Sequence, residues 1–196
     1  MNLLARPVPI APAHIGNPAN GSAEHAMLTA EAHERQEAEQ VAAIVVAKAT
    51  QADIPGLVQC AIGLFAEDAG NRDSTMDAEW PAKDAEQRLA RAILDPSRLV
   101  LAARQAADVV GSLSGVLEPA TAMRPIQVAT LLSLYVHPHH RNNGVRASLV
   151  QQFRSWARQQ NASRIAVTAY TTNETAIGFY QRTGFTPYTL TLEMPA

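Results

Sequence analysis

The chain has 196 residues, a length that suits one domain and is short for two. Hydrophobic residues make up 47% of it and charged residues 17%, so it can bury a substantial core and is not a disordered polyelectrolyte. One cysteine, Cys60, excludes an internal disulfide framework and a thiolate-rich zinc site, and no apolar stretch is long enough to span a bilayer.

The net charge of −2 conceals a separation of acidic and basic residues along the chain. Residues 53–95 contain nine acidic and four basic residues, whereas residues 119–173 contain six arginines and no acidic residue. Such a chain can present a negative electrostatic potential to a cation and a positive one to an anion. Charge alone does not separate this interpretation from chance, and it leaves a nucleotide, a nucleic acid and a membrane surface open as the anion.

Residues 1–40 differ in composition from the rest, and we expect a mobile N-terminal extension ahead of a domain at residues 41–196. Four prolines fall within the first 18 residues, and residues 22–40 are rich in Ala, Glu and Gln without a wide apolar face. An exchanged arm or a partner-binding helix is the alternative for this segment. Because no continuous apolar run precedes the prolines, we expect no secretory signal and a cytoplasmic protein.

Changes in hydrophobic periodicity predict strands and helices from residue 41 onward. Strands are expected at residues 41–48, 99–103, 109–117, 127–136, 165–169 and 185–192. Helices are expected after Asp53, which would cap the first of them, around residues 85–93, and at residues 144–160 and 174–182. The order β-α-α-β-β-β-α-β-α-β predicts a single α/β domain with a mixed sheet and helices on both faces.

The segment at residues 131–150 predicts an anion-binding site. A strand ends at Val136, a polar loop follows Pro138, and a helix begins near Gly144. The first turn of a helix presents unpaired N–H groups and the positive end of the helix dipole, Gly144 leaves room for a phosphate, and Arg141 adds a charge. The segment has neither the Gly-Lys-Ser/Thr ending of a P-loop nor a three-glycine dinucleotide fingerprint, which disfavours nucleoside triphosphates and NAD.

Two motifs resemble those of the GNAT superfamily of acetyl-CoA-dependent N-acetyltransferases. Residues 134–145 read Leu-Tyr-Val-His-Pro-x-x-Arg-x-x-Gly-Val, and residues 173–185 read Asn-x-x-Ala-x-x-Phe-Tyr-x-x-x-Gly-Phe. The spacing and the element order are similar to the family over residues 41–192. The resemblance implies a GNAT-like domain with a twisted, mostly antiparallel sheet, and acetyl-CoA as the co-substrate.

The resemblance also implies how the co-substrate is held. In this family the strand that corresponds to residues 127–136 commonly contains a bulge and diverges from the next strand, and the cofactor enters the slot between them. The backbone of Leu134, Tyr135 and Val136 would pair with the pantetheine arm and direct an N–H at the thioester carbonyl. The pyrophosphate would be held by Arg141 and by the backbone N–H groups of the loop and first helical turn: Asn142, Asn143, Gly144, Val145, Arg146 and Ala147.

Two further residues take roles from the second motif. Asn173 would contact the cofactor or cap its helix. Tyr180 would stand near the sulfur and protonate the departing thiolate as the general acid. The amine would attack the thioester directly, so catalysis would depend on positioning and on a neutral amine.

Two positions depart from the family pattern. Arg146 stands where the phosphate motif has Gly or Ala, and it would either crowd the phosphate site or add a second cation; we favour the second cation. Leu132 stands where many relatives carry a glutamate proposed as the general base. Deprotonation of the amine would therefore need a water relay, another group, or an amine of low pKa.

Other candidate residues lie outside the motifs. Glu67 and Asp68, at the end of the first predicted helix, would bind the amine or act as a remote base, and the alternative is a solvated helix end. His137, His139 and His140 lie close together in the sequence, but histidine pairs with no further ligand at regular spacing are weak evidence for a metal site. We therefore expect them to be loop residues and expect no metal.

The sequence thus predicts an acyltransferase that moves the acetyl group of acetyl-CoA to a primary amine. The acidic first half favours a small, cationic acceptor. The alternatives are a non-catalytic acyl-CoA-binding regulatory module and an acetyltransferase acting on protein or aminoacyl-tRNA amines. A membrane partner is not expected, nucleic acid is expected only as a tRNA acceptor, and a homodimer is compatible with the family.

Overall fold

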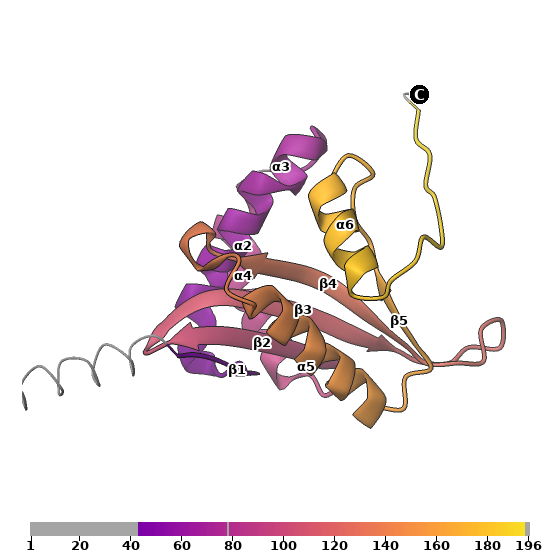
Figure 1. Cartoon of the computed structure of the whole chain (residues 1–196), viewed down its shortest axis with the longest axis horizontal. Coiled ribbons are helices and arrows are strands. Elements are labelled where there is room, and N and C mark those ends of the chain that lie inside the picture. Colours follow the sequence, from indigo (N-terminus) through magenta and orange to yellow (C-terminus); the bar gives the residue numbers. More distant parts are fainter. Residues whose placement is uncertain (1–42, 78, 195–196) are drawn as a thin grey trace, which may run out of the picture. The chain divides into compact units, whose positions relative to one another are not determined.

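A five-stranded sheet in the order β1-β2-β3-β4-β5 organises the computed structural model, which describes residues 43–77 and 79–194 (Figure 1). The predicted extension at residues 1–40 lies outside these residues. The strands are β1 (Ile44–Lys48), β2 (Arg98–Gln105), β3 (Asp108–Glu118), β4 (Val128–Val136) and β5 (Arg164–Val167). The first four strands pair antiparallel, and β5 runs parallel to β4, so the predicted mixed, mostly antiparallel sheet is confirmed.

Helices cover both faces of this sheet, as predicted. The helical elements are η1 (Gln51–Asp53), α2 (Ile54–Glu67), α3 (Ala69–Arg72), α4 (Trp80–Leu94), η2 (Pro138–His140), α5 (Val145–Gln159) and α6 (Glu174–Arg182). Side chains of β2 alternate between the two layers because successive residues of a strand point to opposite faces. Leu99 and Leu101 pack with Phe153 of α5, whereas Val100 and Ala102 pack with Leu57 of α2.

Asp53 is the N-cap residue of α2, as predicted, but its side chain makes no capping hydrogen bond to the helix. Its carboxylate instead accepts hydrogen bonds from the backbone and hydroxyl of Thr50, and it forms an ion pair with Arg104 of β2. The Asp53 carboxylate therefore binds Arg104 and Thr50 instead of the N–H groups of α2. Arg104 is 51 positions away in the sequence, so the residues around Asp53 do not predict this contact.

The last strand of the predicted order is wrong. Residues 185–192 form no strand, and Figure 1 shows this part of the chain running without an arrow to the C-terminus. The alternation of Tyr188, Leu190 and Leu192 has the period of a strand, yet these side chains are 80%, 64% and 84% exposed. A strand requires a partner edge as well as a pattern, and residues 185–192 pair with none of the five strands.

Candidate active site

A groove opens where β4 and β5 separate. Their pairing runs from Val128 opposite Arg164 to Leu131 opposite Val167 and ends there. At the same level the pairing of β4 with β3 shifts: Gly115 lies opposite Leu131, but Ser114 lies opposite Ser133. Leu132 is therefore the extra residue of a β-bulge, which bends the strand. The family resemblance implied this bulge and this separation, and both are present.

The separated strands leave a cavity of about 320 Å³. Its walls come from α2, from β4 on both sides of the bulge, from the end of β5 and the segment after it, and from α6. Glu67, Leu134, Arg141, Arg146 and Tyr180 all line it. The cavity thus gathers residues that the sequence analysis assigned separately to the cofactor, the acceptor and catalysis. A second cavity, of about 480 Å³, lies between α5 and strands β1 and β2 and contains none of the predicted site residues.

The loop before α5 has the conformation expected of an anion-binding turn. Gly144 is the N-cap of α5 with φ +76°, in the left-handed region, and Asn142 has φ +65°. No atom lies within 4 Å of the position that a Cβ on Gly144 would occupy, so the approach to the first helical turn is open. The N–H groups at this end of α5, including those of Val145 and Arg146, have no acceptor within the helix.

Arg141 and Glu67 are brought together by the fold. The Nη2 group of Arg141 donates to both Glu67 oxygens, at 2.7 Å each. The Arg141 Nε donates to the carbonyl of Val136 at 2.8 Å, and its guanidinium lies 5.6 Å from the centre of the Tyr135 ring. A predicted cofactor residue and a predicted acceptor residue therefore form one ion pair.

Tyr180 lies on α6 within an aromatic cluster. Its ring centre is 5.4 Å from that of Phe179 and 5.5 Å from that of Phe185. Burial raises the pKa of the Tyr180 hydroxyl to about 12. The hydroxyl is therefore a proton donor throughout the neutral range, the state that a general acid requires.

Arg146 also lines the cavity and contacts the same aromatic cluster. Its guanidinium lies 5.1 Å from the centre of the Phe179 ring, a cation–π arrangement. Burial, followed by the charge of Arg141, lowers the pKa of Arg146, although arginine stays charged at neutral pH. None of the ion pairs among residues 43–77 and 79–194 includes Arg146. The cavity thus holds a half-buried positive charge, which suits an anionic ligand.

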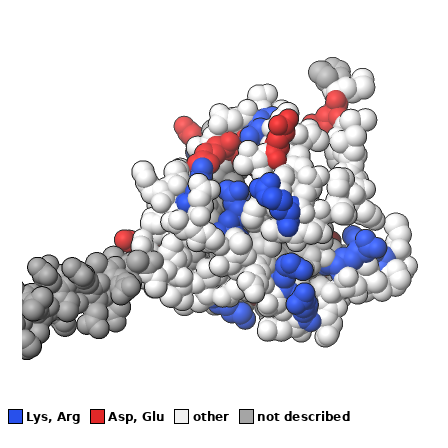
Figure 2. Space-filling model, viewed as in Figure 1, with Lys and Arg blue, Asp and Glu red and all other residues white. Residues whose placement is uncertain are grey.

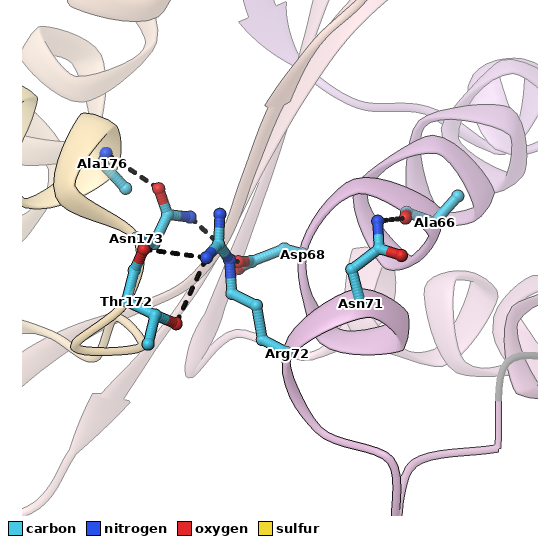
Figure 3. Close-up of polar contacts among 7 residues, drawn as sticks. All are labelled: Ala66, Asp68, Asn71, Arg72, Thr172, Asn173 and Ala176. Carbon is cyan, nitrogen blue, oxygen red and sulfur yellow. Dashed lines mark hydrogen bonds and ion pairs between the residues drawn. The ribbon is translucent and has the colours of Figure 1, made fainter.

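Asp68 and Asn173 tie α2 to the start of α6 (Figure 3). The Asp68 carboxylate accepts from Arg72 at 2.8 Å and from the Asn173 amide at 2.9 Å. The Asn173 oxygen accepts from the backbone N–H of Ala176 at 3.0 Å, so Asn173 caps α6. Arg72 also donates to the carbonyl of Thr172 at 2.8 Å. Asp68 is thus engaged in a structural bridge, and of the two acidic candidates Glu67 is the one coupled to Arg141.

Three features of the site were not predicted from the sequence. They are the Glu67–Arg141 pair, the bridge from Arg72 to Thr172, and the 3.4 Å approach of the Tyr135 hydroxyl to Glu67. Each joins residues 68 or more positions apart, and no local signal marks such a contact.

The surroundings of the cavity differ in charge. Figure 2 shows basic side chains across the face that carries α5 and α6, and acidic side chains toward the end where α3 and the start of α6 lie. Leu132, at the bulge, is 51% exposed, and its aliphatic side chain supplies no carboxylate there. Within the described residues, no group of three or more His, Cys, Asp or Glu side chains could hold a metal ion. No helix in the same part of the chain is long and apolar enough to cross a membrane.

Comparisons with known proteins agree with this geometry. The profile of the Acetyltransferase (GNAT) family matches residues 66–185. A transcriptional regulator from Bacillus halodurans C-125 has 21% identity and a TM-score of 0.63, with 79% of this chain and 100% of that chain covered. An aminoglycoside acetyltransferase, HMB0005, from an uncultured soil metagenomic sample has 19% identity and a TM-score of 0.62, with 79% and 99% covered.

A Ribosomal-protein-alanine N-acetyltransferase from Brucella melitensis biovar Abortus 2308 has 16% identity and a TM-score of 0.60, with 79% of this chain and 100% of that chain covered. At these identities the likeness shows the fold alone. No curated protein matches the sequence. The profile match spans more than half of the chain, so the protein belongs to the GNAT family of acetyltransferases and is an acyltransferase.

Proposed function

We propose that the protein transfers the acetyl group of acetyl-CoA to a small, cationic primary amine, with residues 41–196 as the catalytic domain. The observation that carries this proposal is the groove between β4 and β5. Arg141 and Arg146, which flank the Gly144 turn in the sequence, line a single cavity together with Tyr180. Members of the family use acetyl-CoA as co-substrate, and a long, narrow ligand with a diphosphate suits a groove of this form.

The residues present fit coenzyme A. Beyond Leu131 the edge of β4 no longer pairs with β5, so the backbone groups of Leu134 and Val136 on either side of Tyr135 face this open edge and are available to the amides of a pantetheine arm, although the Val136 carbonyl already accepts from Arg141. Arg141, Arg146 and the first N–H groups of α5 offer positive charge and donors to the diphosphate. The loop residues Asn142 and Asn143 and the following Ala147 complete this proposed phosphate site.

The groove then supports direct transfer. The neutral amine nitrogen forms a bond to the acetyl carbonyl carbon, the bond from that carbon to sulfur breaks, and the proton lost by the nitrogen passes to solvent water, from which Tyr180 is reprotonated. A backbone N–H of β4 donates to the oxygen on which negative charge develops. Tyr180, whose hydroxyl is protonated at neutral pH, donates its proton to the departing sulfur.

Acidic residues favour a cationic acceptor. Glu67 and Asp68 line the cavity at the end of α2, where they pair with Arg141 and Arg72, and further acidic side chains lie at the same end of the molecule, near α3 and the start of α6 (Figure 2). Three of the similar structures are described as aminoglycoside acetyltransferases, and one of these is in complex with sisomicin. Aminoglycosides carry several ammonium groups, so an amine of this class is the acceptor to examine first.

The test has two stages. Calorimetry with acetyl-CoA should show binding to the full chain, and a thiol-release assay should then show turnover with at least one amine. The panel should include sisomicin, spermidine and a peptide with an N-terminal alanine. Absence of acyl-CoA binding would contradict the proposal. Binding without turnover over a broad panel would favour a regulatory acyl-CoA-binding module, and turnover confined to the peptide would favour a protein acceptor.

A further inference from the structure

The loop before α5 and the end of α2 are joined by one carboxylate–guanidinium pair, between Glu67 and Arg141. Both Glu67 oxygens lie 2.7 Å from Nη2 of Arg141. The Arg141 side chain is the charged donor that a diphosphate in this cavity would require. Carboxylate and phosphate oxygens compete for the same guanidinium N–H groups, because both accept charge-assisted hydrogen bonds with similar geometry.

The arginine is held in place independently of Glu67. Its Nε donates to the Val136 carbonyl, and its guanidinium lies beside the Tyr135 ring. Loss of Glu67 would therefore leave Arg141 where it is, at the end of β4 and close to the Gly144 turn. The Arg141 guanidinium can therefore exchange one anionic partner for another without changing its position.

The pair is also accessible enough to exchange. The Arg141 side chain is 31% exposed and the Glu67 side chain 45% exposed. Ion pairs with this degree of exposure contribute little net free energy, because water screens them and solvates the separated charges. A diphosphate, which carries more than one negative charge and also receives the N–H groups of α5, has the advantage over a single carboxylate.

We propose that Glu67 is a built-in competitor of the cofactor's diphosphate for Arg141, so that cofactor binding exchanges the carboxylate for the diphosphate. This inference rests on the proposed function, since it requires coenzyme A in the groove. It assigns Glu67 a role in setting cofactor affinity that neither motif of the sequence indicates.

The test is calorimetry of the full chain with CoA and with ADP, which shares the diphosphate but lacks the pantetheine arm. Glu67→Gln and Glu67→Ala should bind both ligands about two- to fivefold more tightly than the unmodified protein, the range expected for release of a half-exposed ion pair. Glu86→Gln is the matched control: it removes one negative charge from an exposed position on α4 and should leave both affinities unchanged.

A double-mutant cycle identifies the route of the effect. In an Arg141→Gln background, Glu67→Gln should no longer tighten CoA binding, because the competed group is absent. CoA affinity that is unchanged or weaker in both Glu67 variants would overturn the inference while leaving the proposed function intact. If Glu67→Gln tightened CoA binding as much in the Arg141→Gln background as in the unmodified protein, the inference would also be overturned, because the effect would then come from the change in net charge. Failure of the unmodified protein to bind CoA would overturn the proposed function and this inference together.

Discussion

The Asp53–Arg104 ion pair should make folding stability depend on pH in acid. The Asp53 carboxylate is 7% exposed, accepts from Arg104 Nε at 2.5 Å, and accepts from the Thr50 N–H at 2.6 Å. The hydrogen bond from Arg104 is the largest cause that lowers the pKa of Asp53 from 3.8 to about 2. Since one pKa unit corresponds to about 1.4 kcal/mol, the ionised carboxylate contributes about 2 kcal/mol to the free energy of unfolding.

The direction of the pH dependence is set by whether the folded or the unfolded chain binds protons more readily. The pKa of Asp53 is lower in the folded chain, so the unfolded chain takes up the proton first as the pH falls. The contribution is therefore present above about pH 4, declines between about pH 4 and pH 2, and is absent below that range. Asp53→Asn should also destabilise the protein by about 2 to 3 kcal/mol at pH 7, because Arg104 loses its counter-charge.

Urea unfolding between pH 2 and pH 7 measures both effects, with Asp84→Asn as a control that removes an exposed carboxylate. The gap in unfolding free energy between the unmodified protein and Asp53→Asn should narrow by about 2 kcal/mol as the pH falls from 5 to 2. A gap that stays constant over this range would refute the reasoning.

Further expectations concern catalysis and packing. Tyr180→Phe should lower kcat by about a hundredfold or more in the thiol-release assay, evenly from pH 6 to pH 9, with CoA affinity unchanged by calorimetry; equal turnover would remove Tyr180 as the acid. Arg146→Ala should weaken CoA binding by about tenfold, whereas tighter binding would show that the side chain crowds the groove. Gly115→Ala should destabilise by about 1–3 kcal/mol in urea, since its Cβ would lie 2.3 Å from Phe153 Cε2. Gly178→Ala, inside α6 where only the flexible end of Arg182 is near, should stabilise by about 0.5–1 kcal/mol in the same titration, and a loss would contradict the packing described.

The features that the sequence predicted well are those with local causes. The start of α5 after Gly144 and the cap of α6 by Asn173 depend on residues within a few positions, and both lie where the pattern placed them. The contacts that connect the site depend on the folded arrangement. Glu67 and Arg141 are 74 positions apart, and Asp68 and Asn173 are 105 apart. The same limit explains the error at residues 185–192, where a strand pattern is present but a pairing edge is not.

The bulge at Leu132 bends β4 without changing which of its side chains face the core. Before the bulge, Ala129 and Leu131 point into the core beneath α5, and after it Leu134 and Val136 do so. Leu132 and Ser133 therefore occupy the place of one residue in the alternation. Deleting Leu132 would leave the other side chains of β4 on their present faces while removing the bend. The extra residue lies where the pairing of β4 with β5 ends, so a change in chain length at this point would alter the sheet beside the cavity without changing any side chain that lines its far wall.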